Sequence, residues 1–560
     1  MLTRLTRHTL ATATWQQTVI DEATVVGLPD QHPNTEQYFA MASETHIRHT
    51  LDAGSRSTLL QVIIAAVILA LAYYLLTGDR PYAGIPVVKP QCKGLVAWLP
   101  AKYAFMLDSR ALFQRGRKEH SGCFQIAAAG GYKVIIPTRF VEEVKSHPDL
   151  SFTEANAHDF FVKYPGFEGF DSDRAHELLM DMIKWKLTPS SDLITQGLIE
   201  ETNDSYHVNM GEPVEWQTIP LRQQVCDTVA RLSARIFLGQ RFSRNPEWVQ
   251  ISKEYAINGF VSRTILHLFP KPLQPAASWV LPTTRKLRNS SRRVRQMIEP
   301  EVQRRQQDIQ EAEQAGRKPE FDDSICWLLE VAKGRPCDHA AAQLSLSLAS
   351  IHTTTEILSQ TIVQLCDTPE FVPPLRQEVI DILREVGWGR TTLSRMRLMD
   401  SFLKETLRTR DTPATMLRMC TKPVTLSDGT KLPKGALLMV LNESARDPAV
   451  YDEPDKFDAY RYLRMRSKEG EENRHQFTST SADNLGFSHG THACPGRFFA
   501  SNELKIALCF LLLKYDVRFV PGESRPKMMA FEQNHTMPPS VKVQIRRRQE
   551  EVNLLSPKAK

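Results

Sequence analysis

The chain has 560 residues, with 70 Lys and Arg against 64 Asp and Glu, and therefore a formal net charge of +6. This length exceeds the usual size of one domain but suits one large catalytic unit with an anchor. The charge excess is too small to favour nucleic-acid binding, although it suits a surface facing anionic lipid or an acidic protein. The nine cysteines show neither Cys-x-x-Cys spacing nor a dense framework, which favours a reducing, cytosolic location for the main body.

The N-terminal part contains one strongly apolar stretch. Residues 1–57 have no strong periodicity, and their first acid is Asp21, a composition that also suits an organelle transit peptide. Residues 58–76 read TLLQVIIAAVILALAYYLL, in which Gln61 is the one strongly polar side chain. At a rise of about 1.5 Å per residue they would span the hydrocarbon thickness of a bilayer. We predict a poorly ordered extension over 1–57 and a transmembrane anchor over 58–76, with a buried core helix as the alternative.

The residues flanking this stretch predict its orientation. Within about twenty residues, Arg48 and Arg56 precede it and Arg80, Lys89 and Lys93 follow it, so the positive-inside rule weakly favours a cytosolic C-terminal body. Residues 77–95 are rich in Pro and Gly, and such a linker is stiff enough to hold a globular body against a membrane.

The body is predicted to be mainly α with a small β region, an α+β fold. Strand patterns over 124–127 and 132–136 are joined by Gly130 and Gly131, which is typical of a hairpin. Three more strand patterns occupy 416–419, 426–435 and 437–441. A charged helix over 292–313 has a thin apolar stripe, which favours a solvated surface, with contact to lipid headgroups as the alternative. Residues 466–484 are polar and predict an exposed loop.

The longest helical pattern extends from Asp338, the expected N-cap, to Cys366. It carries a cluster of hydroxyl groups around Thr353. Such hydroxyls bond back to the carbonyl four residues earlier and bend a helix locally, which can admit water or oxygen. A polar face against solvent is the alternative, but apolar neighbours such as Leu348 and Ile351 favour a buried helix.

Glu405 and Arg408 lie three residues apart on one face of a predicted helix, where they can form a bidentate pair. Spacing alone does not distinguish this pair, because the chain repeats it at Glu301 and Arg304, Glu443 and Arg446, and Glu471 and Arg474.

One cysteine lies in the stretch Gly486-Phe-Ser-His-Gly-Thr-His-Ala-Cys494-Pro-Gly-Arg-Phe-Phe-Ala500. Gly490 and Gly496 allow a tight turn and a close approach to a flat, bulky group, and Phe487 can cover one face of that group. Amides at the start of the following helix can point at the sulfur and favour its thiolate, which is a suitable ligand for haem iron. For an isolated Cys-Pro-Gly, a buried structural cysteine would be the alternative.

The spacing Phe487-x-x-Gly490-x-x-x-Cys494-x-Gly496 resembles the haem-binding signature of cytochrome P-450 monooxygenases, and its surroundings are similar to those of fungal members. The resemblance covers residues 85 to 545, including the hinge. It implies the P-450 fold over 96–545, a charged tail over 546–560, and haem b with Cys494 as the axial ligand of the iron.

The same resemblance assigns roles to further residues. Thr353 matches the threonine that helps to deliver protons during oxygen activation, whereas His352 stands where the family has an acid. A neutral imidazole can relay a proton but need not hold the same water chain. Arg418 and His492 would bind the haem propionates, and Lys186, next to an aromatic residue, matches a degenerate motif for a further propionate contact.

Order along the chain selects one of the acid and arginine pairs. Glu405 and Arg408 lie about ninety residues before Cys494 and are followed by Arg461 in a segment that resembles the family's Phe-x-Pro-x-Arg, with Ala459 in place of the proline. In this family the glutamate and the two arginines form a buried charge network.

The resemblance further implies insertion of oxygen from O2 into a small lipophilic substrate. No flavin or dinucleotide fingerprint occurs, so electrons would come from NADPH through a separate reductase, with cytochrome b5 as a further candidate donor. The protein would be a single-pass protein of the endoplasmic reticulum membrane, with its catalytic domain facing the cytosol and contacting lipid. Similarity to the ent-kaurene oxidase type favours a terpenoid, and a polyketide or an alkaloid is the second choice. A peroxide-driven or isomerising haem-thiolate enzyme and a non-catalytic haem-binding electron-relay membrane protein are the rival hypotheses.

Overall fold

The computed structural model of the protein describes residues 79–89, 101–107, 109–389, 391–410 and 412–555, together with Gln61, Ile64 and Ala65. The chain divides into two compact units, residues 1–76 and 77–560. The predicted extension over 1–57, nearly all of the predicted anchor over 58–76 and part of the hinge lie outside the described residues. Within the described part, no helix combines the length and the apolar character that a membrane crossing requires.

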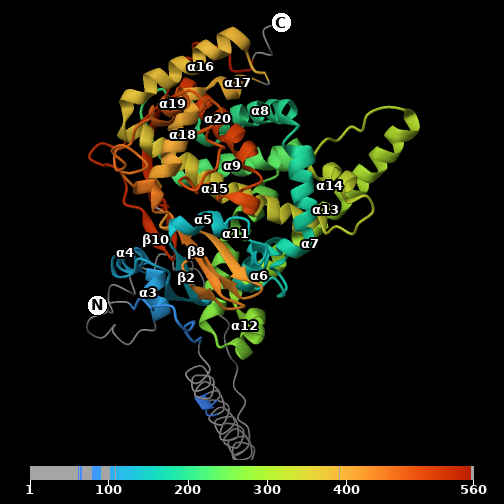
Figure 1. Ribbon diagram of the computed structural model, residues 1–560. Coiled ribbons are helices and arrows are strands. Elements are labelled where there is room, and N and C mark those ends of the chain that lie inside the picture. The colour runs from blue at the N-terminus through green and yellow to red at the C-terminus, as the bar shows by residue number, and fades with distance from the viewer. Residues whose placement is uncertain are drawn as a thin grey trace, which may run out of the picture. The chain divides into compact units, whose positions relative to one another are not determined.

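The second unit is mainly helical, as predicted (Figure 1). Its earlier helices are α3 (Ala101–Leu107), α4 (Ser109–Glu119), α5 (Val141–Val144), α6 (Phe152–Phe160), α7 (Ser172–Met182), α8 (Ser191–Met210), α9 (Leu221–Leu238), α10 (Gln240–Ser243), α11 (Pro246–Leu268), α12 (Gln274–Val280), α13 (Pro282–Ala315) and α14 (Ser324–Ala332). Its later helices are α15 (His339–Asp367), α16 (Val372–Val386), α17 (Thr392–Arg395), α18 (Arg397–Thr409), α19 (Arg461–Arg466) and α20 (Arg497–Lys514).

The described strands form small sheets, the largest with the order β1-β2-β8-β5-β3. Its strands are β1 (Phe124–Ala128), β2 (Gly131–Ile136), β3 (Leu150–Ser151), β5 (Ala414–Cys420) and β8 (Leu437–Leu441). The other sheets are β4-β12-β9, β10-β11 and β6-β7, built from β4 (Gln217–Pro220), β6 (Val424–Thr425), β7 (Lys431–Leu432), β9 (Tyr515–Phe519), β10 (Met529–Phe531), β11 (Asn534–Thr536) and β12 (Lys542–Arg547). The predicted hairpin is present, since β1 pairs with β2 in antiparallel register.

The described part of the hinge is attached to this largest sheet. The amide of Val88 donates to the carbonyl of Gln125 at 2.9 Å, and the amide of Gln125 donates to the carbonyl of Pro86 at 2.8 Å. Ile85 and Val88 are buried. This segment therefore behaves as an added edge of β1, which fixes where the chain enters the body.

The predicted long helix is α15, and it runs through the middle of the helical part of the unit (Figure 1). The Asp338 carboxylate caps it by accepting a hydrogen bond from the Ala341 amide at 3.0 Å. It packs against α9, α11, α13, α18 and α20, and most of its side chains are buried. Ala349 and Thr353, one turn apart on one face, are exceptions because both are exposed.

Two surface predictions have different outcomes. The charged helix exists as α13 and buries an apolar stripe that includes Leu287, Val294 and Ile298, as expected for an amphipathic surface helix. The prediction of an exposed loop over 466–484 is wrong for its second half, because Phe477 is 1% exposed. The Lys404 ammonium group also donates to two carbonyls in that half, those of Gln476 and Ser479. These bonds anchor the segment just before the cysteine loop.

A buried ion cluster holds α6 against its neighbours. Asp159 of α6 pairs with Lys133 at 3.2 Å and with Arg263 of α11 at 2.9 Å, and Arg263 also pairs with Glu532 at 2.9 Å. Although burial alone would raise it, the charges of Lys133 and Arg263 hold the pKa of the Asp159 carboxyl well below its usual value. The cluster joins α6, β2, α11 and the turn between β10 and β11.

His267 makes this cluster sensitive to acid. Burial, reinforced by the charge of Arg263, lowers the pKa of His267 from 6.5 to about 3. The unfolded chain therefore binds one more proton between these values, and stability falls as the pH falls. Between about pH 7 and about pH 5, we expect the free energy of unfolding to fall by about 2 kcal/mol less in His267→Gln than in the wild type. Urea unfolding at both pH values measures this difference. The exposed His207 is the control, and an equal loss in His207→Gln would contradict the assignment.

Candidate active site

The loop that carries Cys494 is closed by its own backbone. The Cys494 amide donates to the carbonyl of Phe487 at 2.8 Å, and the Ala493 amide donates to the carbonyl of Gly490 at 3.0 Å. The guanidinium of Arg497, the first residue of α20, donates to the Cys494 carbonyl at 2.8 Å. The sulfur is thus fixed directly in front of α20.

Backbone amides at the start of α20 point at the Cys494 sulfur. Burial raises the pKa of the Cys494 thiol, while hydrogen bonds from the amides of Gly496 and Arg497, with the charge of Arg497, lower it. The amides act in the predicted direction, but they do not outweigh burial. A metal ion at the sulfur would add a positive charge that favours the thiolate.

The two glycines of the cysteine loop have different surroundings. Gly490 has φ +78°, and a Cβ there would lie 2.5 Å from the carbonyl oxygen of Lys145. The positive φ agrees with the predicted tight turn, and the close backbone contact with the end of α5 is a further reason for glycine here. Gly496 has φ −84° and no atom within 4 Å of a built Cβ, so it serves as the residue preceding α20. Phe487 packs edge-to-face on Phe477 with ring centroids 5.1 Å apart.

On α15, Thr353 and His352 face different ways. The Thr353 hydroxyl donates to the Ala349 carbonyl at 2.6 Å, which is the predicted back-bond. Thr353 and Ala349 both lie on the exposed face of α15. His352 lies against α11, where its Nε2 is 2.9 Å from the carbonyl of Lys253. Burial lowers the pKa of His352, so its neutral ring donates this hydrogen bond. The predicted partnership of the two residues in proton delivery therefore gains no support from their orientation.

Glu503 of α20 is a site neighbour that the sequence reasoning missed. Its carboxyl is fully buried, accepts a hydrogen bond from the Ser233 hydroxyl of α9 at 3.0 Å, and is also hydrogen-bonded to Thr354 of α15. Burial raises its pKa to about 8, so it is mostly neutral at pH 7. It joins the helix behind Cys494 to the residue after Thr353. An acid nine positions after Cys494, within an apolar helix, was the available signal.

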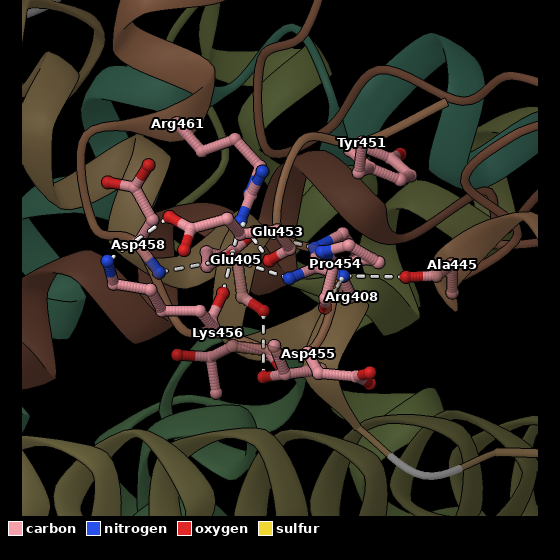
Figure 2. Close-up of polar contacts among 12 residues, drawn as sticks. Glu405, Arg408, Ala445, Tyr451, Glu453, Pro454, Asp455, Lys456, Asp458 and Arg461 are labelled. Carbon is pink, nitrogen blue, oxygen red and sulfur yellow. Dashed lines mark hydrogen bonds and ion pairs between the residues drawn. The ribbon is translucent and has the colours of Figure 1, made fainter. Parts of the chain in front are cut away.

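The three residues of the predicted charge network lie together (Figure 2). The Glu405 carboxylate accepts two hydrogen bonds from Arg408, at 2.8 and 2.7 Å, and one from Arg461 at 3.0 Å. All three are buried, with Glu405 0% exposed. The remaining donors of Arg408 are used by the carbonyls of Ala445 and Pro454. The network therefore attaches α18 to the segment that leads toward α19.

A cavity of about 330 Å³ lies beside the cysteine loop, between α18, β5 and the turn before β11. Arg418 and His492 line it, together with Gly486 and Ser488 of the loop. Arg418 is 1% exposed, and its Nη1 donates to the Leu417 carbonyl, whereas its Nε and Nη2 have no hydrogen-bond partner. Burial lowers its pKa to about 10, so the guanidinium remains charged. A buried cation with two unused donors fits a carboxylate ligand.

Lys186 has a different partner from the one predicted. It belongs to a π-helical segment, Ile183–Leu187, and its ammonium group pairs with Glu330 of α14. It is not among the residues that line the described cavity. Trp185 beside it is 60% exposed. The geometry gives Lys186 a role in joining this segment to α14, and the predicted propionate contact is not supported.

Comparison with known sequences decides the family. A family profile described as cytochrome P450 (P-450) matches residues 187–545. The chain belongs to the cytochrome P-450 family. The P-450 monooxygenase bsc2 of Alternaria brassicicola is 40% identical over 503 residues, covering 88% of this chain and 95% of the relative. The P-450 monooxygenase 1 of Gibberella fujikuroi is 38% identical over 434 residues, covering 77% of this chain and 98% of the relative.

A solved structure agrees with the fold. The cyanobacterial P-450 CYP120A1, solved with bound retinoic acid, aligns with a TM-score of 0.61 at 16% sequence identity. The alignment covers 83% of this chain and 99% of that one. The protein is thus a P-450 monooxygenase by family, with relatives in fungal secondary metabolism.

The residues of this P-450 fit haem. Cys494 would hold the iron and Arg418 a propionate, since a buried guanidinium with free donors suits that carboxylate. When bound, haem iron stabilises the deprotonated form of a coordinating thiol and gains electron density that favours O–O cleavage. Thr353 presents a hydroxyl from an exposed turn of α15, where it can hold a proton or a water molecule.

Proposed function

We propose that this P-450 inserts one oxygen atom from O2 into a small lipophilic terpenoid of fungal specialised metabolism. Electrons would come from NADPH through a separate reductase, with cytochrome b5 as a further candidate donor. The observation that carries the reaction class is the Cys494 loop, closed on itself in front of α20, beside a cavity with a buried unpaired Arg418. The sequence resemblance to ent-kaurene oxidase-type enzymes supports the substrate class.

The proposal includes a membrane location. Residues 58–76 would anchor the protein in the endoplasmic reticulum membrane, and residues 77–95 would connect this anchor to a catalytic body over 96–545 that faces the cytosol. Support comes from the apolar composition of 58–76 and from the positive charges that follow it. An anchor of this kind would place the body next to lipid, where lipophilic substrates partition.

The test of the proposed function uses the full-length protein with a fungal reductase. Reduction under carbon monoxide should give the red-shifted Soret band of a thiolate complex. Incubation with NADPH and a panel of terpenoids, polyketides and alkaloids should give a product heavier by one oxygen atom from one of the terpenoids. A product from a polyketide or alkaloid would keep the reaction and change the substrate class. Haem-loaded protein without the shifted band would reject the reaction class.

Thr353→Ala tests the distal helix. Because the Thr353 hydroxyl lies on an exposed turn of α15, its loss should reduce the product formed per NADPH consumed by about tenfold, which is less than the full effect of about 10²–10⁴-fold for an acid–base residue. Parallel assays of NADPH, product and hydrogen peroxide measure this ratio.

Thr361→Ala is the matched control for this measurement. Thr361 makes the same back-bond on α15, to the Ile357 carbonyl at 2.7 Å, but it is fully buried. Its removal should leave the coupling ratio near that of the wild type. Unchanged coupling in Thr353→Ala would remove Thr353 from proton delivery.

A further inference from the structure

A second arginine enters the cavity that Arg418 lines. Arg410 follows the end of α18, and its side chain faces the same 330 Å³ space. Among the described residues that line this cavity, the positively charged side chains are those of Arg410 and Arg418, and no lining residue is acidic. The wall around them is otherwise a mixture of apolar side chains, such as Leu407 and Met439, with a few neutral polar ones.

Arg410 lacks a partner for its charge inside the cavity. Its Nε is enclosed and has no hydrogen-bond partner, and no ion pair of its guanidinium occurs within the described part of the chain. Among the described residues, the charge of Glu356 of α15 acts on Arg410, but no hydrogen bond joins the two. The Oε1 atom of Glu356 accepts from the Met537 amide at 2.8 Å and from Gln360 at 2.7 Å. Its Oε2 is buried without a hydrogen-bond partner and lies 3.9 Å from Arg222, and no bond joins it to Arg410. Arg410 is half-buried, and a guanidinium without an ion pair at the edge of a cavity can bind an external anion.

We propose that Arg410 binds a carboxylate of the substrate, so that this enzyme oxidises an amphipathic acid with an apolar skeleton. This inference rests on the proposed function and narrows its substrate class. A planar guanidinium donates two parallel hydrogen bonds to a carboxylate, which fixes the orientation of the bound molecule. Gln533, in the turn before β11, lines the same cavity, and its side-chain oxygen has no partner, so it can accept a hydrogen bond from a hydroxyl group of the ligand.

Haem could supply the carboxylate instead of the substrate, because haem carries two propionates. Arg418, with two unused donors, and His492 of the cysteine loop are the residues expected to bind the two propionates, which would leave Arg410 for a third carboxylate. A diphosphate ester is a poorer match because it carries more charge than one remaining arginine balances, and the described lining includes no lysine. The apolar side chains beside Arg410 suit a hydrocarbon skeleton. The experiment must therefore separate a substrate carboxylate from a haem propionate.

The test uses ω-(imidazol-1-yl)alkanoic acids of stepped chain length and their methyl esters. The imidazole binds the haem iron and shifts the Soret band, so titration of the full-length haem-loaded protein gives Kd whatever the natural substrate is. For at least one chain length in the series, the acid should bind the wild type about tenfold more tightly than its methyl ester, as expected for a hydrogen-bonded ion pair. In Arg410→Gln this preference should vanish, with haem content and the carbon monoxide band unchanged. In Arg410→Lys part of the preference should remain.

Arg222→Gln is the matched control. Arg222 approaches the same Glu356 at 3.9 Å but does not line the described cavity, so its removal should leave the acid preference intact. Equal affinity for acid and ester at every chain length in the wild type would overturn the inference, and so would a preference that survives Arg410→Gln. A lower haem content in Arg410→Gln, with the preference intact in the fraction that retains haem, would assign Arg410 to a propionate. A wild-type protein without the carbon monoxide band would instead reject the proposed function.

Discussion

Cys494→Ala is expected to abolish both the red-shifted carbon monoxide band and all turnover with NADPH and O2. The Cys494 sulfur receives hydrogen bonds from the amides of Gly496 and Arg497, and the loop around it is closed by the bond from its own amide to the Phe487 carbonyl. Alanine keeps that backbone bond and removes only the sulfur. The variant should therefore fold and lose the band, a result that far-ultraviolet circular dichroism and the carbon monoxide difference spectrum measure together.

Cys509→Ala is the control for this loss. Cys509 lies on the same helix, α20, and its sulfur lies 3.6 Å from the sulfur of Met396 in the core. It is fully buried, so its removal lowers stability without affecting a ligand. The band should persist in this variant. Retention of the band in Cys494→Ala, or its loss from folded Cys509→Ala, would contradict the assignment of the ligand.

Features that depend on local spacing could be predicted from the sequence. The cap at Asp338 and the length of α15 follow from a helix period and a nearby proline, and the hairpin of β1 and β2 follows from two glycines between apolar runs. The position of Glu405 and Arg408 required more than spacing. Four pairs share the interval of three residues, and only the order of motifs along the chain selected the buried one.

Features that depend on tertiary orientation could not be predicted. Neighbouring residues on a helix point about 100° apart, so His352 reaches α11 although it adjoins Thr353, whose hydroxyl stays on the exposed face. Lys186 has the right position in the chain for a propionate contact but pairs with Glu330, which lies 144 residues further on. The role of Gly490 required knowledge of the Lys145 carbonyl against it. In each example a distant segment decides the contact.

The Glu405 network offers the largest expected change in stability. Glu405 accepts from two arginines and from the Asp458 amide at 3.1 Å, and Glu405, Arg408 and Arg461 are all buried (Figure 2). Glu405→Gln keeps the shape of the side chain but removes the negative charge, which leaves Arg408 and Arg461 buried without a counter-charge. Loss of one partner of a buried pair typically lowers the free energy of unfolding by about 3–5 kcal/mol. We expect a loss of this size and weaker retention of haem.

Glu471→Gln provides a matched comparison within the same chain, because Glu471 and Arg474 have the same interval of three residues and a bond of 2.9 Å. The Arg474 side chain is 70% exposed, so water replaces the lost partner, and the expected change is only about 0–1 kcal/mol. Urea unfolding of the wild type and both variants, with haem loss followed in parallel, compares the two pairs directly. Similar losses in the two variants would mean that burial does not set the strength of the Glu405 network. A large loss confined to Glu405→Gln would show that the bonds of this network, and not the spacing of its residues, hold α18 to the segment before α19.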